Sequence, residues 1–309
     1  MNQHDDSDPL ASLEDWARKT ERKVRRQRRL GGFAAKLRYV VPAAVLVALI
    51  VAAVPLVRSV WPQEKAAAPA PTVDGVTATT SAGAAPTGPF DGTAAAGYPI
   101  GAKGITLPAA KEVTGFTAVE VGADLRKVRD ALVAGRLDPH MTVEHRADEF
   151  LALLAPTSRA QIAKWFKSSA FATLATWIDP KVKLDPVNQP RVSGRVTYKS
   201  VSENGRNTLR VTTNFVWVYA FQGEFAWRPL AVQHDEITWD FPETGNLRAA
   251  DKGMWVHGTH SYGAWIDCAA ADKGLVAPTP KGDGGGVNTE DQDSLAEPDH
   301  PLDVGDDCH

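Results

Sequence analysis

The chain has 309 residues, of which 43% are hydrophobic and 23% are charged, so it holds enough apolar material for a folded domain. Its net charge of −3 argues against a general nucleic-acid binder, and its two cysteines exclude a disulfide-dense scaffold and a four-cysteine zinc site. The charge is polarised. Residues 16–38 carry ten Lys/Arg and one acid, whereas residues 281–309 carry nine Asp/Glu and one lysine.

Residues 1–38 are predicted to be cytoplasmic, with a disordered stretch followed by a basic helix that Ser12 caps and Gly31 ends. We expect the helix to set membrane topology and to lie on anionic lipid, where each cation contributes about 1 kcal/mol. Docking of a cytoplasmic protein is the second interpretation. Nucleic acid is a third that we do not expect, because no base-reading motif is present. The proposed binding residues are Arg18, Lys19, Arg22, Lys23, Arg25, Arg26, Arg28 and Arg29.

Residues 39–57 are 19 consecutive residues without a charge, close to the length that crosses a bilayer as a helix. Ten cationic residues precede this stretch and only Arg58 and Lys65 follow it closely, so the positive-inside rule places the N-terminus in the cytoplasm. A cleaved signal peptide is the alternative. The 38-residue leader, the long apolar stretch and the prolines after Ala68 and Ala70 favour an uncleaved anchor in the cell membrane.

Residues 58–104 are predicted to be a disordered linker, because 29 of the 38 residues from Pro62 to Pro99 are Ala, Pro, Gly, Thr or Ser. An extracytoplasmic domain is predicted over residues 105–271, and an acidic disordered tail over residues 272–309. The linker would hold the domain away from the bilayer and leave it free to reorient.

The first half of the outer domain has the periodicity of three helices. Apolar residues recur on one helical face over residues 123–136, again from 142 to 154, and again from 157 to 170. The second half has the alternation of long strands over 192–199, 208–221, 227–241 and 254–266, with a turn at Asn204-Gly205 and a bulge near Gln233-His234. This order predicts an α+β fold with helices on one face of an antiparallel sheet.

The order of three helices and then long strands resembles the nuclear-transport-factor-2-like superfamily, over roughly residues 120–267. With the anchor, it looks like the cone-fold inner-membrane subunits of type IV secretion and conjugation machines, or the Mce-associated membrane proteins. The resemblance implies three helices packed on a curved antiparallel sheet that forms a cone, after a single transmembrane helix. It also implies an assembly subunit rather than an enzyme. The candidate cone-lining residues are Tyr198, Phe215, Trp217, Tyr219 and Phe221.

Catalytic and metal-binding residues are not expected. His234 and Asp235 are adjacent in a strand, so their side chains should point to opposite faces and cannot form a dyad without a bulge. His257 and His260 would also lie on opposite faces, with no neighbouring carboxylate or cysteine, which argues against zinc. No standard nucleotide, hydrolase or metalloprotease motif occurs, so no cofactor is expected.

Cys268 and Cys308 are both on the predicted outer side, where disulfides can form. An intramolecular bridge is the favoured interpretation, with free thiols or an intermolecular bridge as alternatives. Taken together, the sequence predicts a non-enzymatic, single-pass membrane adaptor with protein partners in the cytoplasm or the envelope and a capacity for self-association. Exposed tryptophans on the sheet (Trp227, Trp239, Trp255 and Trp265) would supply the self-association surface. The alternative is a binding protein for a small apolar ligand, or an isomerase- or dehydratase-type enzyme, that uses the cone.

Overall fold

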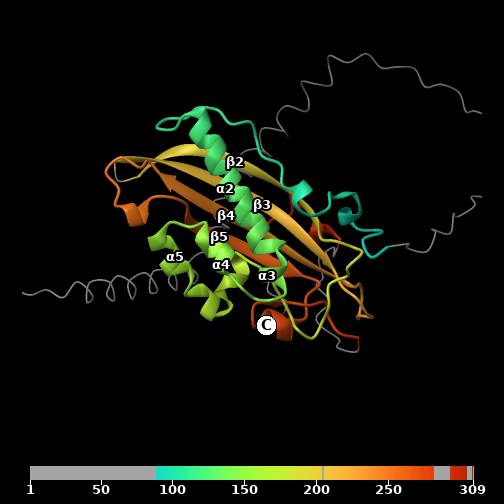
Figure 1. The fold of residues 1–309 in the computed structure, drawn as a ribbon. Coiled ribbons are helices and arrows are strands. Elements are labelled where there is room, and N and C mark those ends of the chain that lie inside the picture. The colour runs from blue at the N-terminus through green and yellow to red at the C-terminus, as the bar shows by residue number, and fades with distance from the viewer. Residues whose placement is uncertain (1–87, 204, 282–292, 305–307, 309) are drawn as a thin grey trace, which may run out of the picture. The chain divides into compact units, whose positions relative to one another are not determined.

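A four-stranded antiparallel sheet in the order β2-β3-β4-β5 organises the computed structural model, which describes residues 88–203, 205–281, 293–304 and 308 (Figure 1). The strands are β2 (Arg191–Glu203), β3 (Arg206–Ala220), β4 (Leu230–Pro242) and β5 (Trp255–Ala264). A second, two-stranded parallel sheet pairs β1 (Trp177–Ile178) with β6 (Leu275–Val276). The strands agree closely with the alternating stretches of the sequence.

Strand β3 is the central element, and its register with both neighbours is regular along its length. Phe215 pairs with Gly194 of β2 and with Asp235 of β4. The irregularity of the sheet lies between Thr238 and Trp239, where β4 pairs with β5. The bulge predicted near Gln233-His234 is therefore wrong in position. From Phe215 to Ala220 every residue of β3 is buried, because both faces of the sheet are covered.

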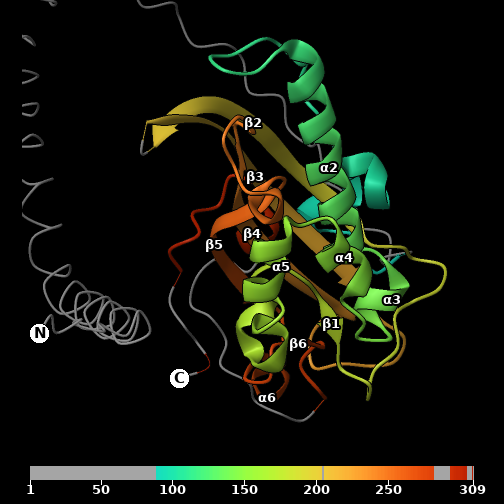
Figure 2. The ribbon, with the colours of Figure 1, turned by 60° about the vertical axis from the view of Figure 1, so that its left-hand side comes forward.

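The helices cover one face of the sheet (Figures 1 and 2). The long helix is α2 (Ala118–Arg136), whose first turn is closed by a capping box between Thr117 and Glu120. The others are short: α3 (Pro139–Thr142), α4 (Asp148–Ala152), α5 (Pro156–Ile162) and α6 (Cys268–Ala271). Single 3₁₀ turns follow α5 at η3 (Trp165–Lys167) and η4 (Ser169–Thr173), and η5 (Ala249–Asp251) precedes β5.

The predicted fold class is therefore wrong. The second and third predicted helices are instead a series of short helices and turns, so a cone of three helices is not found, and the four-stranded sheet dominates the described residues. No helix in the described ranges is both long and apolar enough to cross a bilayer. The stretch predicted to span the membrane, residues 39–57, and the basic segment before it lie outside the described residues.

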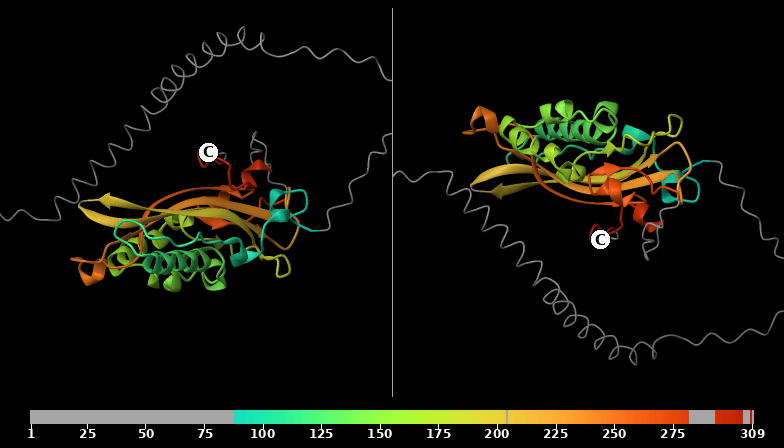
Figure 3. Two further views of the ribbon diagram at one scale, coloured as in Figure 1. Left: turned by 90° about the horizontal axis from the view of Figure 1, so that it is seen from above. Right: turned by 90° about the horizontal axis from the view of Figure 1, so that it is seen from below.

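Two apolar cores lie on opposite faces of the sheet. The larger core packs α2 and the short helices against the odd-numbered side chains of β3, such as Phe215 and Trp217. The smaller core lies on the other face, which we call the convex face. It joins Val216 and Val218 to Phe90, near η1 (Ala94–Gly97), and to Leu295 in η6 (Ser294–Ala296). Figure 3 shows the sheet edge-on, with the helices on one side and the C-terminal segment on the other.

The folded domain is larger than the sequence predicts at both ends. Residues 88–104, placed in the linker, contain η1 and η2 (Gly101–Gly104), and Ile100 bridges to Arg191 of β2. Residues 293–304, placed in the disordered tail, contribute Leu295 and Ala296 to the convex-face core, at 2% and 0% exposure. We call residues 293–304 the strap. The Oη of Tyr98 donates a hydrogen bond of 2.9 Å to the carbonyl of Ala296, joining the two ends.

Candidate functional site

The predicted cone-lining side chains fill the space between sheet and helices. Phe215, Trp217 and Tyr219 are completely buried and Phe221 is 2% exposed, all within the larger core. Tyr198 lies at the margin of this core, where its hydroxyl donates to the carbonyl of Ala109 and accepts from the amide of Lys111. The structure thus brings four of the five residues together as packed core and leaves the fifth bound to backbone.

A buried ion pair lies in this core, between the end of α2 and β4. The Nη2 of Arg136 is 3.1 Å from the Oδ2 of Asp235, and both side chains are completely buried. The indole Nε1 of Trp217 donates to the same carboxylate oxygen at 2.7 Å. Burial raises the pKa of Asp235 to about 6, and the positive charge of Arg136 opposes that rise.

Two hydroxyl groups join Arg136 in a closed cycle of hydrogen bonds, while its Nε is buried without a hydrogen-bond partner. Its Nη1 donates to the Oγ1 of Thr176 at 3.1 Å, and this oxygen is 2.9 Å from the Oη of Tyr219. Tyr219 in turn donates to the backbone carbonyl of Arg136 at 2.9 Å. Because general acid–base catalysis needs a proton donor or acceptor within reach of a substrate, this enclosed network is suited to holding the helix end on the sheet.

The sequence pointed to one member of this pair. Asp235 shares its strand face with Ile237 and Trp239, so strand alternation turns it inward. Arg136 ends an amphipathic helix, where a cation ordinarily reaches solvent and interacts with the helix dipole. Nothing in the sequence alone marks it as buried.

His234 points to the convex face, away from Asp235, as alternation predicts. Its Nδ1 is 3.0 Å from the Oη of Tyr262 and its Nε2 is 3.0 Å from the Oδ1 of Asn214. Burial lowers the pKa of His234 to about 4, so the ring is neutral at pH 7. The hydroxyl of Tyr262 donates to the carbonyl of Leu295 at 2.8 Å, which connects the histidine to the strap.

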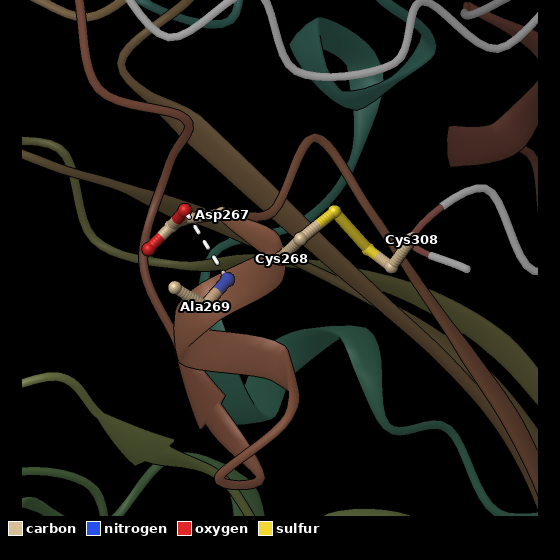
Figure 4. Close-up of a disulfide and its surroundings, with 4 residues drawn as sticks. All are labelled: Asp267, Cys268, Ala269 and Cys308. Atoms are coloured by element: carbon tan, nitrogen blue, oxygen red, sulfur yellow. Dashed lines mark hydrogen bonds between the residues drawn. A yellow bond between two sulfur atoms is a disulfide. The ribbon is translucent and has the colours of Figure 1, made fainter.

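A disulfide between Cys268 and Cys308 holds the strap end of the chain against the domain, with the two Cα atoms 5.4 Å apart (Figure 4). Of the three arrangements considered from the sequence, the structure has the intramolecular bridge. Cys268 is the first residue of α6, whose N-cap Asp267 accepts a hydrogen bond from the amide of Ala269. The strap also carries Asp299, which pairs with Arg195 of β2.

The four tryptophans proposed as an exposed surface do not form one. Trp239 is completely buried, Trp265 is 9% exposed, and Trp255 is partly buried with its indole N–H donated to the carbonyl of Asp251. Trp227 is 51% exposed, and Arg228 stacks on its ring at 4.7 Å. Of these four tryptophans, only Trp227 has more than half of its surface exposed.

One open hollow, of about 470 Å³, lies at the other end of the sheet and contains a cluster of Glu203, Asp240 and His257. The guanidinium of Arg210 lies within this cluster. Its Nη2 is 2.7 Å from an oxygen of each carboxylate and 3.2 Å from the Nδ1 of His257. A metal cation would have to displace this arginine, which already serves as the counter-ion of both carboxylates.

A second cluster of the same composition lies at the junction of α3 and α4. It consists of Asp138, His140 and Glu149, with one ligand atom from each within 4.8 Å of the others. The Nδ1 of His140 is 3.4 Å from the Oδ1 of Asp138 and 3.3 Å from the Oε1 of Glu149. The residues are close in sequence, but they match no standard metal motif, so the sequence alone does not mark them as a site.

The basic residues of the N-terminal segment lie outside the described part of the chain, so their contacts stay predictions. No protein-family model, curated protein or solved structure matches this chain.

Proposed function

We propose that the protein is a non-enzymatic, single-pass membrane adaptor. In this proposal the basic segment before residue 39 faces the cytoplasm, where it contacts anionic lipid and a cytoplasmic assembly. The outer domain then contacts a protein partner in the envelope or a second copy of itself. Secretion, conjugation, division and contractile injection machines are the classes of assembly that such an adaptor would serve.

The observation that carries the proposal is the way the sheet is packed on both faces. The aromatic side chains that could line a ligand cavity are core residues with at most 2% exposure. His234 and the Oδ2 of Asp235, the acid–base candidates of β4, interact with other buried side chains, and the Oδ1 of Asp235 is buried without a hydrogen-bond partner. This arrangement leaves the surface of the domain for recognition, and it gives no support to the alternative of a ligand-binding cone or an isomerase.

The disulfide supports the placement of the domain outside the cytoplasm. Structural disulfides persist in oxidising compartments and are rare where thiols are kept reduced. The bridge of Cys268 to Cys308 closes the domain that follows the apolar stretch 39–57, on the side that the positive-inside rule assigns to the exterior. Charge distribution and cysteine chemistry thus favour the same orientation.

The test is photo-crosslinking in living cells from two separate positions of the full-length chain. A crosslinker at Thr20 should capture a discrete cytoplasmic protein, and one at Trp227 should capture an envelope protein or a second copy of the chain. An adaptor requires specific proteins at Thr20. Capture of lipid and background alone at that position would reduce the basic segment to a topology signal and refute the adaptor.

A matched variant separates protein docking from simple charge. Replacing Arg22, Arg25, Arg26 and Arg29 together by lysine keeps the positive charge that sets topology and attracts lipid. It removes the planar, bidentate donors with which arginine binds carboxylates. We expect this variant to keep its orientation and membrane level but to lose most of the cytoplasmic crosslink.

A further inference from the structure

The described residues contain two clusters that combine one histidine, one aspartate and one glutamate, and they differ in how their charge is balanced. In the cluster of Glu203, Asp240 and His257, Arg210 supplies a cation to both carboxylates. In the cluster at the α3–α4 junction, Asp138 and Glu149 have no lysine or arginine partner within the described residues, and each faces His140. One cluster therefore has an arginine as counter-ion, and the other has none among the described residues.

The neighbouring Arg146 forms no salt bridge with Asp138 or Glu149. Arg146 is paired with Glu144 and Asp148, its guanidinium nitrogens lying 3.4 Å from an oxygen of each. Its hydrogen bond to Asp148 raises the pKa of Arg146 and lowers the pKa of Asp148, so this pair is satisfied within itself. Asp138 additionally accepts the backbone N–H of His140, and Glu149 acts on Arg146 at longer range without forming a salt bridge with it.

The Nδ1 atom of His140 is the centre of the second cluster. It is buried, although half of the ring is exposed, and it has no hydrogen-bond partner. Its separations of 3.4 Å and 3.3 Å from the two carboxylate oxygens are long for a hydrogen bond. They match the spacing of about 3.3–3.4 Å between tetrahedral ligands whose bonds to zinc are about 2.0–2.1 Å long.

The ring of His140 is also oriented for metal binding. Nδ1 faces Asp138 and Glu149, whereas Nε2 lies 3.9 Å from the carboxylate of Glu144, beyond hydrogen-bond distance. His145 fixes the connecting turn by stacking on Trp177 at 4.7 Å and by bonding the carbonyl of Ile178 at 2.9 Å. The ligands are thus preorganised on the body of the domain.

We infer that Asp138, His140 and Glu149 form a binding site for one divalent transition-metal ion, of which Zn²⁺ is the type that this donor set suits best. An imidazole with two carboxylates is a zinc ligand set, and three protein ligands leave a fourth position for water or for a ligand from a partner. Asp138 can serve twice, because its Oδ1 accepts the α3 cap bond from the amide of His140 and carboxylate oxygens have further lone pairs.

The test is Zn²⁺ binding to the full-length protein in detergent, measured by equilibrium dialysis with metal analysis after treatment with a chelator. We expect one bound ion per chain. His140→Ala and Glu149→Gln should each weaken Zn²⁺ binding at least tenfold. His257→Ala, which alters the cluster already filled by Arg210, should leave the affinity unchanged and is the matched control.

Two results would overturn the inference: no Zn²⁺ bound above background by the wild type, or equal binding by wild type and His140→Ala. A second measurement does not depend on the fold of any variant. Co²⁺ added to the wild-type protein should give the intense visible absorption of a tetrahedral site, and Zn²⁺ should abolish it. A weak octahedral spectrum, or none, would refute the site.

Discussion

The strongest prediction concerns the buried pair of Arg136 and Asp235, and the perturbation is Asp235→Asn. The substitution keeps the size of the side chain and an oxygen that can accept the indole N–H of Trp217. It removes the negative charge 3.1 Å from the guanidinium, which stays completely buried. Arginine cannot release its proton in a protein, so the variant must hold an uncompensated buried cation.

Removing one partner of a buried ion pair costs about 3–5 kcal/mol of unfolding free energy, and we expect this cost for Asp235→Asn at pH 8, where the wild-type carboxyl is ionised because the pH lies above its pKa of about 6. Arg136→Met should behave differently, because the remaining acid can take up a proton. The pKa of Asp235 is already about 6 beside the arginine, and losing that charge raises it further. The cost of Arg136→Met should therefore be smaller at pH 5 than at pH 8.

The assay is urea unfolding of the full-length protein in detergent, followed by tryptophan fluorescence, for both single variants and for the double variant Arg136→Met/Asp235→Leu. The double variant has no buried charge and should lie within about 1–2 kcal/mol of the wild type. The reasoning fails if Asp235→Asn costs under about 1 kcal/mol. It also fails if the cost of Arg136→Met is the same at both pH values.

Three further predictions use the same unfolding assay. Cys268→Ser should lower stability by about 3–4 kcal/mol, because the bridge closes a loop with a sequence separation of 40 residues, and adding a reductant should then have no further effect. The pKa of His234 falls from 6.5 to about 4 on folding, so the folded protein favours the neutral ring by about 3 kcal/mol. That stabilisation is fully present above pH 6.5 and is lost as the pH falls toward 4. The stability difference between wild type and His234→Gln should narrow over that range, and a constant difference would contradict it. Gly194→Ala should cost about 3 kcal/mol or more, because its Cβ would overlap the carbonyl oxygen of Asn214, whereas Gly258→Ala, with open space around it, should cost almost nothing.

The sheet was predictable because strand alternation is a local property of the sequence. The odd-numbered residues of β3 from Leu209 to Tyr219 are aromatic or branched, and the Asn204-Gly205 pair in the sequence predicts a tight turn before β3. The short helices were not predictable in the same way. His145 has a φ of 57°, a left-handed conformation that ends the helical path between α3 and α4, and its stacking on Trp177 is a tertiary contact.

The packing of the strap on the sheet could not be predicted from the sequence, because two apolar residues in an acidic segment produce no periodic pattern. Leu295 and Ala296 are buried only because the face opposite the helices is apolar. The apolar character of that face is visible in the sequence, because Val216 and Val218 alternate with the inward aromatic residues and make β3 apolar on both sides. A strand of this kind needs a cover on each face.

The candidate metal site was missed for a different reason. Its three side chains come from within twelve consecutive residues, but no regular helix or strand relates them. Asp138 caps one short helix and Glu149 lies in the first turn of the next, and the chain between them decides whether their carboxylates meet. His257 and His260 could be assessed as zinc ligands from the sequence, because the periodicity of a strand shows which face each side chain takes.

The hydrogen bond between Tyr98 and Ala296 joins residues 198 positions apart, and this separation has a kinetic consequence. The hairpins of β2, β3 and β4 close short loops, so we expect them to form early. The bond between Tyr98 and Ala296 can form only after both covering segments have reached the sheet, although the strap itself reaches Tyr262 over only 33 positions. Until both segments are in place Val216, Val218 and Val232 are exposed to solvent, and we expect the domain to be liable to aggregate in that interval.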